Sequence, residues 1–210
     1  MIKYTDVISE QDIINKYDYI EYKNNSNISM GMKHINNVID ICKKLSTILE
    51  LDEETKNNLL IAAALHDIGK ISDIKDHNYQ SFNYSFDYLR YRVDTKSRNI
   101  ITGTILRHSN ESEGLLENLL SLANALDITR KRLIDPFKLE DNIYNKIKEV
   151  EISKESDYFF VNVITFNNII IDLLKFDDII IGWKNICDYF NLNYKILVND
   201  KEVLIESKVK

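Results

Sequence analysis

Apolar residues recur at helical spacing between about residues 9 and 134, and this pattern constrains the fold more than any other feature of the chain. One amphipathic stretch covers residues 30–49. The next helix is expected to begin after Asp52, a good N-cap residue, and to end at Gly69. The stripe in the first stretch comprises Val38, Ile41, Leu45 and Ile48, flanked by Ile35, Ile39, Cys42 and Leu49. Further helices are predicted over 78–92, 96–108 and 113–132. A bundle of helices is therefore expected.

The pattern changes after the only proline, Pro136. A short helix is predicted around 137–148, and "YFFVNVITF" (158–166) then alternates as a strand does. Further strands are predicted at "VEIS", "YKILVND" and "EVLIES" (150–153, 194–200 and 202–207). Residues 167–190 are predicted to form a long amphipathic helix, although their two Ile triplets leave buried strands as an alternative. The expected layout is a helical domain over residues 1–135 and a small α+β domain over 136–210.

Charge and cysteine content narrow the classes of function. The formal net charge is −6, and no basic stripe is present, so a surface that tracks long nucleic acid is not expected. A small anionic substrate stays compatible, because a bound cation can reverse the local field. Cys42 and Cys187 lie in apolar patterns and are expected to be buried free thiols. No signal peptide and no membrane-spanning run is recognisable, which predicts a cytoplasmic protein.

The four histidines are the first candidates for chemistry. Each alone is more typical of a hydrogen-bonded core residue than of a ligand. Their joint placement argues otherwise, because His34, His66 and His108 each lie on the core-facing side of a different predicted helix. Buried imidazoles need partners, and a shared metal ion is one.

Asp67 strengthens this interpretation because it directly follows His66 at the end of an apolar helix. Adjacent helical residues diverge by about 100°, yet near a helix end both can reach the same cation. Imidazole and carboxylate ligands together suit one or two divalent ions such as Mn²⁺, Fe²⁺ or Zn²⁺, or Mg²⁺ with fewer histidines. The doublet therefore predicts a metal site.

His34, followed by "HDIGK" at 66–70 and a late acidic element, resembles the HD superfamily of metal-dependent phosphohydrolases over about residues 30–132. His77 and His108 resemble the additional ligands of members that bind two metals. The tail resembles the small C-terminal domain of a bacterial branch. The resemblance implies a mainly α fold, with an HD-type helical bundle followed by a small α+β domain. It also implies that metal-activated water cleaves a phosphoester or phosphoanhydride, often in a nucleotide.

The sequence departs from the family at the last ligand. The family usually has an Asp where this chain has Asn124, and Asp127 follows three residues later. Residues three apart share a helix face, so Asp127 could replace the missing ligand, or Asn124 could bind through its amide oxygen. The alternative for Asp127 is a structural ion pair with Lys131, without a role in metal binding. The departure puts metal affinity and turnover in question.

Cations near the site would stabilise the charge of a phosphoryl transition state. The candidates are Lys70, Arg107, Arg130 and Arg132, with Lys70 the best because it lies one turn beyond His66. Solvated surface charge is the alternative for each. Asp67 and Lys70 are the expected catalytic residues, and Asp67 could bridge two metals or accept a proton from water.

Aromatic residues 79–91 could stack on a nucleobase, but Phe82, Phe86 and Leu89 are expected to form a core stripe. The leading hypothesis is a phosphohydrolase for a small phosphorylated compound, with a nucleotide as the expected substrate. The alternative is a metal- or nucleotide-binding regulatory protein with little turnover, which Asn124 favours. Self-association through the C-terminal domain is compatible with both.

Overall fold

The computed structural model describes residues 2–72, 74–108, 114–138, 142–169, 171 and 177–203. Its α-helices are α1 (Tyr4–Ser9), α2 (Gln11–Lys23), α3 (Met32–Ile48), α4 (Glu53–Leu65), α5 (His77–Leu89), α6 (Thr95–Arg107), α7 (Leu115–Ala125), α8 (Ile143–Lys146) and α9 (Asp177–Phe190). Short 3₁₀ helices are η1 (Ile68–Ile71), η2 (Arg130–Arg132) and η3 (Phe166–Asn168). The strands are β1 (Ile147–Glu155), β2 (Tyr158–Thr165), β3 (Asn193–Val198) and β4 (Lys201–Glu202).

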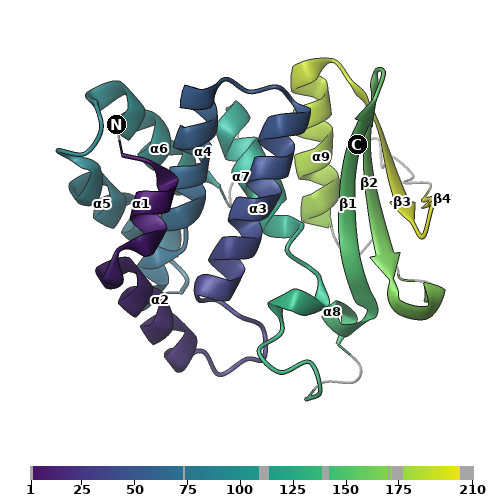
Figure 1. Cartoon of the computed structure of the whole chain (residues 1–210), viewed down its shortest axis with the longest axis horizontal. Helices are drawn as coiled ribbons and strands as arrows, with labels where there is room; N and C mark the ends of the chain where they lie inside the picture. The colour runs from purple at the N-terminus through teal and green to yellow at the C-terminus, as the bar shows by residue number, and fades with distance from the viewer. Residues whose placement is uncertain are drawn as a thin grey trace.

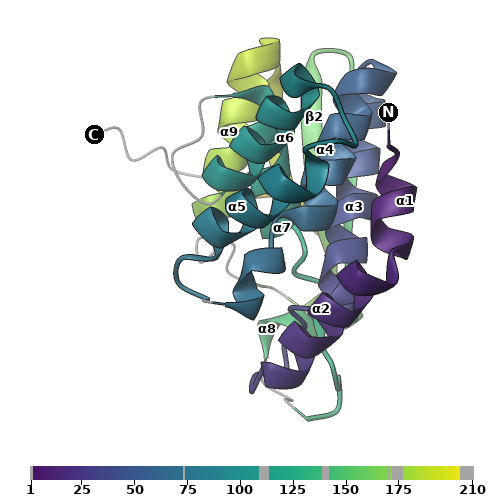
Figure 2. The same cartoon turned by 90° about the vertical axis from the view of Figure 1, so that its left-hand side faces the viewer.

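The helices form a bundle, and α9 stands between this bundle and the sheet (Figure 1). Helices α1, α2, α5 and α6 lie on the side away from the sheet (Figure 2). The predicted fold class, a helical bundle followed by a small α+β part, is confirmed. In the part of the chain that the structure describes, no helix is long and apolar enough to cross a membrane.

Helix α4 is the central element of the bundle. Every residue from Asn58 to Leu65 is buried, and neighbouring α3, α6, α7 and α1 all contact it. A helix that is apolar on every face is stable only when other elements surround it. Small alanines at 62–64 let those neighbours approach. The C-terminal end of α4 consequently lies in the protein interior.

The start of α4 follows the prediction, whereas its end does not. The Asp52 side chain caps the helix by accepting a hydrogen bond from Thr55 N (2.9 Å). The helix ends at Leu65, four residues before the predicted Gly69. A Cβ atom on Gly69 would lie 2.4 Å from both His77 O and Ser81 N of α5. Gly69 is therefore needed for a close approach between η1 and α5.

The structure corrects three predictions for the helices: the apolar stripes of α3 and α5 and the C-terminal end of α7. In α3, Ile35, Val38 and Cys42 are buried, but Ile41 and Ile48 lie at the edge of the face. In α5, the buried positions are Ser81, Ser85 and Leu89, while Phe82 and Phe86 stay half-buried, because only small residues fit against η1. Helix α7 ends at Ala125, well before the predicted residue 132.

The sheet has the order β1-β2-β3-β4. Strands β1 and β2 form an antiparallel hairpin, and α9 connects β2 to the parallel strand β3. Phe159, Val161 and Val163 are buried on one face of β2, as predicted, and Trp183 of α9 stacks on Phe159 with ring centroids 4.1 Å apart. Strand β1 is an edge strand on which Glu149, Glu151 and Glu155 are exposed.

Other C-terminal predictions are partly confirmed. Residues 177–190 are helical, which excludes the strand alternative for the second Ile triplet. The short helix expected around 137–148 covers only α8, because β1 already begins at Ile147. The last predicted strand is described only as β4 and Val203, and residues 204–210 lie outside the described residues. Cys42 and Cys187 are buried free thiols, as expected.

The helical and α+β parts are packed together through α7 and α9. A Cβ atom on Gly182 would lie 3.4 Å from Leu122, so the two helices approach closely at this point. The boundary expected at residue 135 falls in the segment between η2 and α8. The division into two domains stays a prediction.

Replacement of Gly69 by Ala should destabilise the fold. The added methyl group would contact the α5 backbone, and such overpacking costs typically about 1–3 kcal/mol of unfolding free energy. Gly103→Ala is the matched control, because its Cβ would contact only the guanidinium end of the Arg107 side chain, at 3.0 Å, and no backbone atom. Urea unfolding measures both variants. Equal stability of the two would contradict the close contact at Gly69.

Candidate metal centre

Four histidines and one aspartate from four helical segments meet in the interior. His34 lies in the first turn of α3, and His66 and Asp67 directly follow α4. His77 is the first residue of α5, and His108 directly follows α6. The ring centroids of His34 and His66 are 5.5 Å apart, those of His66 and His108 5.0 Å, and those of His77 and His108 5.6 Å. Helix ends therefore bring all five side chains to one place.

One ring nitrogen of each histidine is held by a neighbouring acceptor. Nδ1 of His66 lies 2.9 Å from Ala63 O, and Nδ1 of His108 lies 2.7 Å from Ile105 O. These carbonyls belong to the last helical turns, where backbone acceptors lack helical partners. Nδ1 of His77 lies 2.8 Å from the Ile74 carbonyl in the same way, and Nδ1 of His34 faces a carboxylate. Nδ1 therefore donates in each ring, so in the neutral imidazole it is Nε2 that carries the lone pair.

Those Nε2 lone pairs are left without protein partners. Nε2 of His34, His66 and His108 and Oδ1 of Asp67 are buried and accept no hydrogen bond from the described residues. A buried polar atom without a partner costs about 1–3 kcal/mol. Divalent cations bound among these side chains would give each of the four atoms a partner. The donor set therefore fits a metal centre.

The geometry divides the ligand atoms into two groups that share Asp67. His34, His66 and Asp67 form one group, and Asp67, His77 and His108 form the other, with ligand atoms within 4.8 Å of one another in each. Asp67 Oδ2 lies 3.4 Å from His34 Nε2, whereas Oδ1 lies 3.3 Å from His77 Nε2. Each carboxylate oxygen thus faces a different group. This arrangement suits a carboxylate that bridges two ions.

The protonation states favour cation binding. Burial lowers the pKa of His66 well below 6.5 and that of His108 to about 4, so both rings are neutral at pH 7. Burial alone would raise the pKa of Asp67. The neighbouring His66 ring and the Lys70 ammonium hold it well below 3.8 instead. His66, His108 and Asp67 therefore need not release protons at neutral pH before they bind a metal.

Asp127 occupies a different position from the ligand position that we expected. Its Oδ2 lies 2.6 Å from His34 Nδ1, on the far side of the ring from Asp67. Its Oδ1 accepts a hydrogen bond from Asn37 (3.0 Å), and Arg132 Nε lies 3.6 Å from Oδ2. Helix α7 ends before Asp127, so the helical spacing behind the expectation does not apply. The expected alternative, an ion pair with Lys131, is replaced by Arg132.

The four candidate cations have different surroundings. Lys70 Nζ lies 2.5 Å from Asp67 Oδ2 and so contacts the doublet directly. Arg107 is paired with Glu117, and Arg132 contacts Asp127. The guanidinium carbon of Arg130 lies 5.5 Å from the ring centroids of both Phe137 and Phe166. Of these four cations, only Lys70 contacts a residue of the two ligand groups that share Asp67.

Asn124 lies half-buried in the last turn of α7. Its backbone carbonyl accepts a hydrogen bond from Asp127 N (3.3 Å), and its side chain has no hydrogen-bond partner among the described residues. Its role as a ligand stays a prediction.

Sequence reasoning missed two residues that support the site. The hydroxyl of Tyr17 donates to Ala64 O (2.8 Å) immediately before the His66–Asp67 doublet, and no sequence signal points to it. Asn37, three residues after His34 in α3, could have been found, because residues three apart share a helix face.

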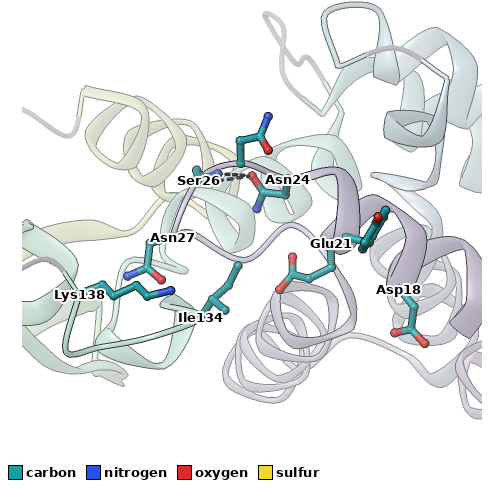
Figure 3. A pocket seen from close by; sticks show the side chains of 9 residues that line it. Asp18, Glu21, Asn24, Ser26, Asn27, Ile134 and Lys138 are labelled. Carbon is teal, nitrogen blue, oxygen red and sulfur yellow. Dashed lines mark hydrogen bonds between the residues drawn. The ribbon is translucent and has the colours of Figure 1, made fainter.

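A separate cavity of about 560 Å³ lies at the end of α2 and includes none of the four histidines (Figure 3). Glu21 lines it and accepts hydrogen bonds from Met30 N (2.8 Å) and Gly31 N (3.0 Å). Glu21 therefore caps the start of α3, and Asn27 ties the same region to Asp135. These contacts fix the entry of the helix that carries His34.

The family model named HD domain matches residues 31–159, which include all five clustered side chains. The chain belongs to the HD domain family. The match extends past the expected boundary at 135, covers all of β1 and ends at Phe159, the second residue of β2. A search of curated proteins finds no match. HD domain proteins bind divalent metals, and the two ligand groups of this member agree with that property.

The shared carboxylate leads to a prediction about metal content. Asp67→Ala should remove metal from both groups, whereas His77→Ala should spare the group of His34, His66 and Asp67. Elemental analysis of protein purified without chelators measures both variants. Full metal content in Asp67→Ala would show that the ligand groups lie elsewhere.

The carboxylate behind His34 leads to a second prediction. Asp127→Asn still accepts a hydrogen bond but lacks the charge that makes the imidazole a better ligand. Loss of such a partner typically weakens metal binding about 10–100-fold. Metal titration measures the change, with the exposed Asp18→Asn as control. An unchanged affinity would leave Asp127 without a role at the metal centre.

Proposed function

We propose that this HD domain protein is a metal-dependent phosphohydrolase that cleaves a phosphoester or phosphoanhydride of a small phosphorylated compound, with a nucleotide as the expected substrate. The observation that carries the proposal is the set of four buried, unpartnered ligand atoms in two groups that share Asp67. A bound divalent metal lowers the pKa of water and polarises a phosphoryl oxygen.

Each residue of the site would have a separate role in this reaction. His34, His66, His77 and His108 would hold the metal through Nε2, with Nδ1 fixing each ring. Asp67 would bind through both oxygens and so set the spacing between two ions. Lys70 would leave the carboxylate when a cation takes its place and would then offer its ammonium group to phosphoryl oxygens.

A small substrate is favoured over a long nucleic acid. The net charge of −6 would repel an extended phosphate backbone. Of the arginines expected to bind substrate, Arg107 and Arg132 already contact carboxylates, so they do not form a free basic track.

Regulatory metal or nucleotide binding with little turnover is the second candidate. Asp67 is the only carboxylate in the two ligand groups, so two divalent ions would be poorly neutralised. Asn124 adds no charge where the family usually has an Asp. Both features predict weak metal binding and therefore little turnover, which favours the regulatory candidate.

Activity assays with Lys70→Met separate these candidates. With Mn²⁺, Fe²⁺, Zn²⁺ or Mg²⁺, the wild-type protein should release phosphate from a panel of nucleotides and small phosphate esters. Lys70→Met should lower kcat by about 10-fold or more while metal content is kept, because one charge on the transition state is lost. Asn124→Asp should raise metal affinity or rate.

Two other outcomes would count against hydrolysis. Metal bound at full stoichiometry without turnover of any substrate would favour the regulatory candidate. Turnover that survives Asp67→Ala would come from another site or a contaminant.

A further inference from the structure

A second cavity, of about 410 Å³, lies where α3, the segment after α7 and β1 meet. Asn37 and Asp127 line it, and so do Lys44 from α3, Lys131 from η2 and Lys148 from β1. Its volume falls within the 300–1,000 Å³ range of small-molecule sites. The cavity therefore joins a set of surface lysines to the carboxylate behind His34.

The lysines give this cavity an excess of positive charge. The side chains of Lys44, Lys131 and Lys148 make no ion pair or hydrogen bond with any described residue. Lys43, a fourth cation in the lining, is already paired with Asp40 at 2.9 Å. Glu149 is the one acidic lining residue without an ion pair among the described residues, since Asp127 is paired with His34 and Arg132.

Three unpaired cations from three separate segments line one cavity of a protein whose net charge is −6. All three lysines are exposed, and positive charge of one sign along a cavity wall attracts small anions to it. Thr129 and Asn37 add polar side chains to the lining that can hydrogen-bond to phosphoryl oxygens. The volume leaves room for an organic group beside the phosphoryl group.

We propose that this cavity binds the phosphoryl group of a small organic phosphate and that binding there changes the metal affinity of the HD centre. The connection runs through two hydrogen bonds. Asn37 Nδ2 donates to Asp127 Oδ1 (3.0 Å), and Asp127 Oδ2 lies 2.6 Å from His34 Nδ1. A ligand that engages Asn37 alters the carboxylate that orients His34.

This binding site is distinct from the site of hydrolysis. His34 presents Nε2 to the ligand groups and Nδ1 to Asp127, so the ring separates the metal centre from the cavity. An anion in the cavity would therefore lie on the Asp127 side of His34, opposite the metal ligands, where it can act on the metal centre only through Asp127 and His34. The binding step does not require the protein to hydrolyse anything.

Calorimetric titration of the Asp67→Ala variant with adenosine monophosphate, inorganic phosphate and adenosine tests the binding step. This background removes the shared ligand of the metal centre. Adenosine monophosphate should bind, inorganic phosphate should bind more weakly, and adenosine should not bind. If inorganic phosphate binds as tightly as the ester, the occupant is free phosphate and the organic group has no role. If no probe binds, the proposal is wrong.

Charge-matched triple variants identify the site. Lys44→Gln, Lys131→Gln and Lys148→Gln together should weaken probe binding at least 10-fold. Lys154→Gln, Lys184→Gln and Lys201→Gln remove the same charge from exposed positions outside the cavity and should leave binding unchanged. Equal weakening in both would mean that only net charge matters, and the cavity would not be the site.

Metal titration of the wild-type protein with and without adenosine monophosphate tests the coupling. Because coupling is reciprocal, the metal should change probe affinity by the same factor, about 5-fold or more. The cavity triple variant should abolish this change, which also controls for metal chelation by the probe in solution. A metal affinity that the probe leaves unchanged would overturn the regulatory part of the proposal.

Discussion

The structure depends on the burial of lone pairs that have no partner in the protein. Nε2 of three histidines and one oxygen of Asp67 face one another in the interior, and each would cost free energy if it stayed alone. The chain fixes the other nitrogen of each ring with a carbonyl or carboxylate, so the lone pairs cannot turn away. Such preorganisation lowers the folding stability in the absence of a cation, and a cation that binds there raises the folding stability again. The site is therefore also a stability element.

The central helix makes that burial possible. Because the second half of α4 is buried on every side, its C-terminal end lies inside the bundle, and the doublet that follows is shielded from bulk water. The close approach of η1 and α5 at Gly69 then brings His77 to the same place. The same packing that buries the alanines of α4 therefore also positions the metal ligands.

Much of this could be predicted from the sequence, and the failures share one cause. Helical spacing identified the segments that carry His34, His66 and His108, because periodic burial is a local property. The ends of α4 and α7 were wrong, because they depend on contacts with elements distant in sequence. Asp127 was placed by helical spacing that stops at Ala125. The stripe on α5 was wrong because its inner face needs small serines rather than large aromatic rings.

Strand β1 has a consequence for assembly. It is an edge strand with exposed Glu149, Glu151 and Glu155, whose odd numbers place them on one face. If two copies paired β1 antiparallel about a two-fold axis, each residue would face the residue equally distant from the centre. Whichever residue from 149 to 153 lies on the two-fold axis, a glutamate of one copy faces a glutamate of the other. Like charges directly opposite each other are destabilising. The strand thus resists growth of the sheet across a symmetric dimer. The charges on β1 therefore disfavour a dimer that would join two sheets through this edge.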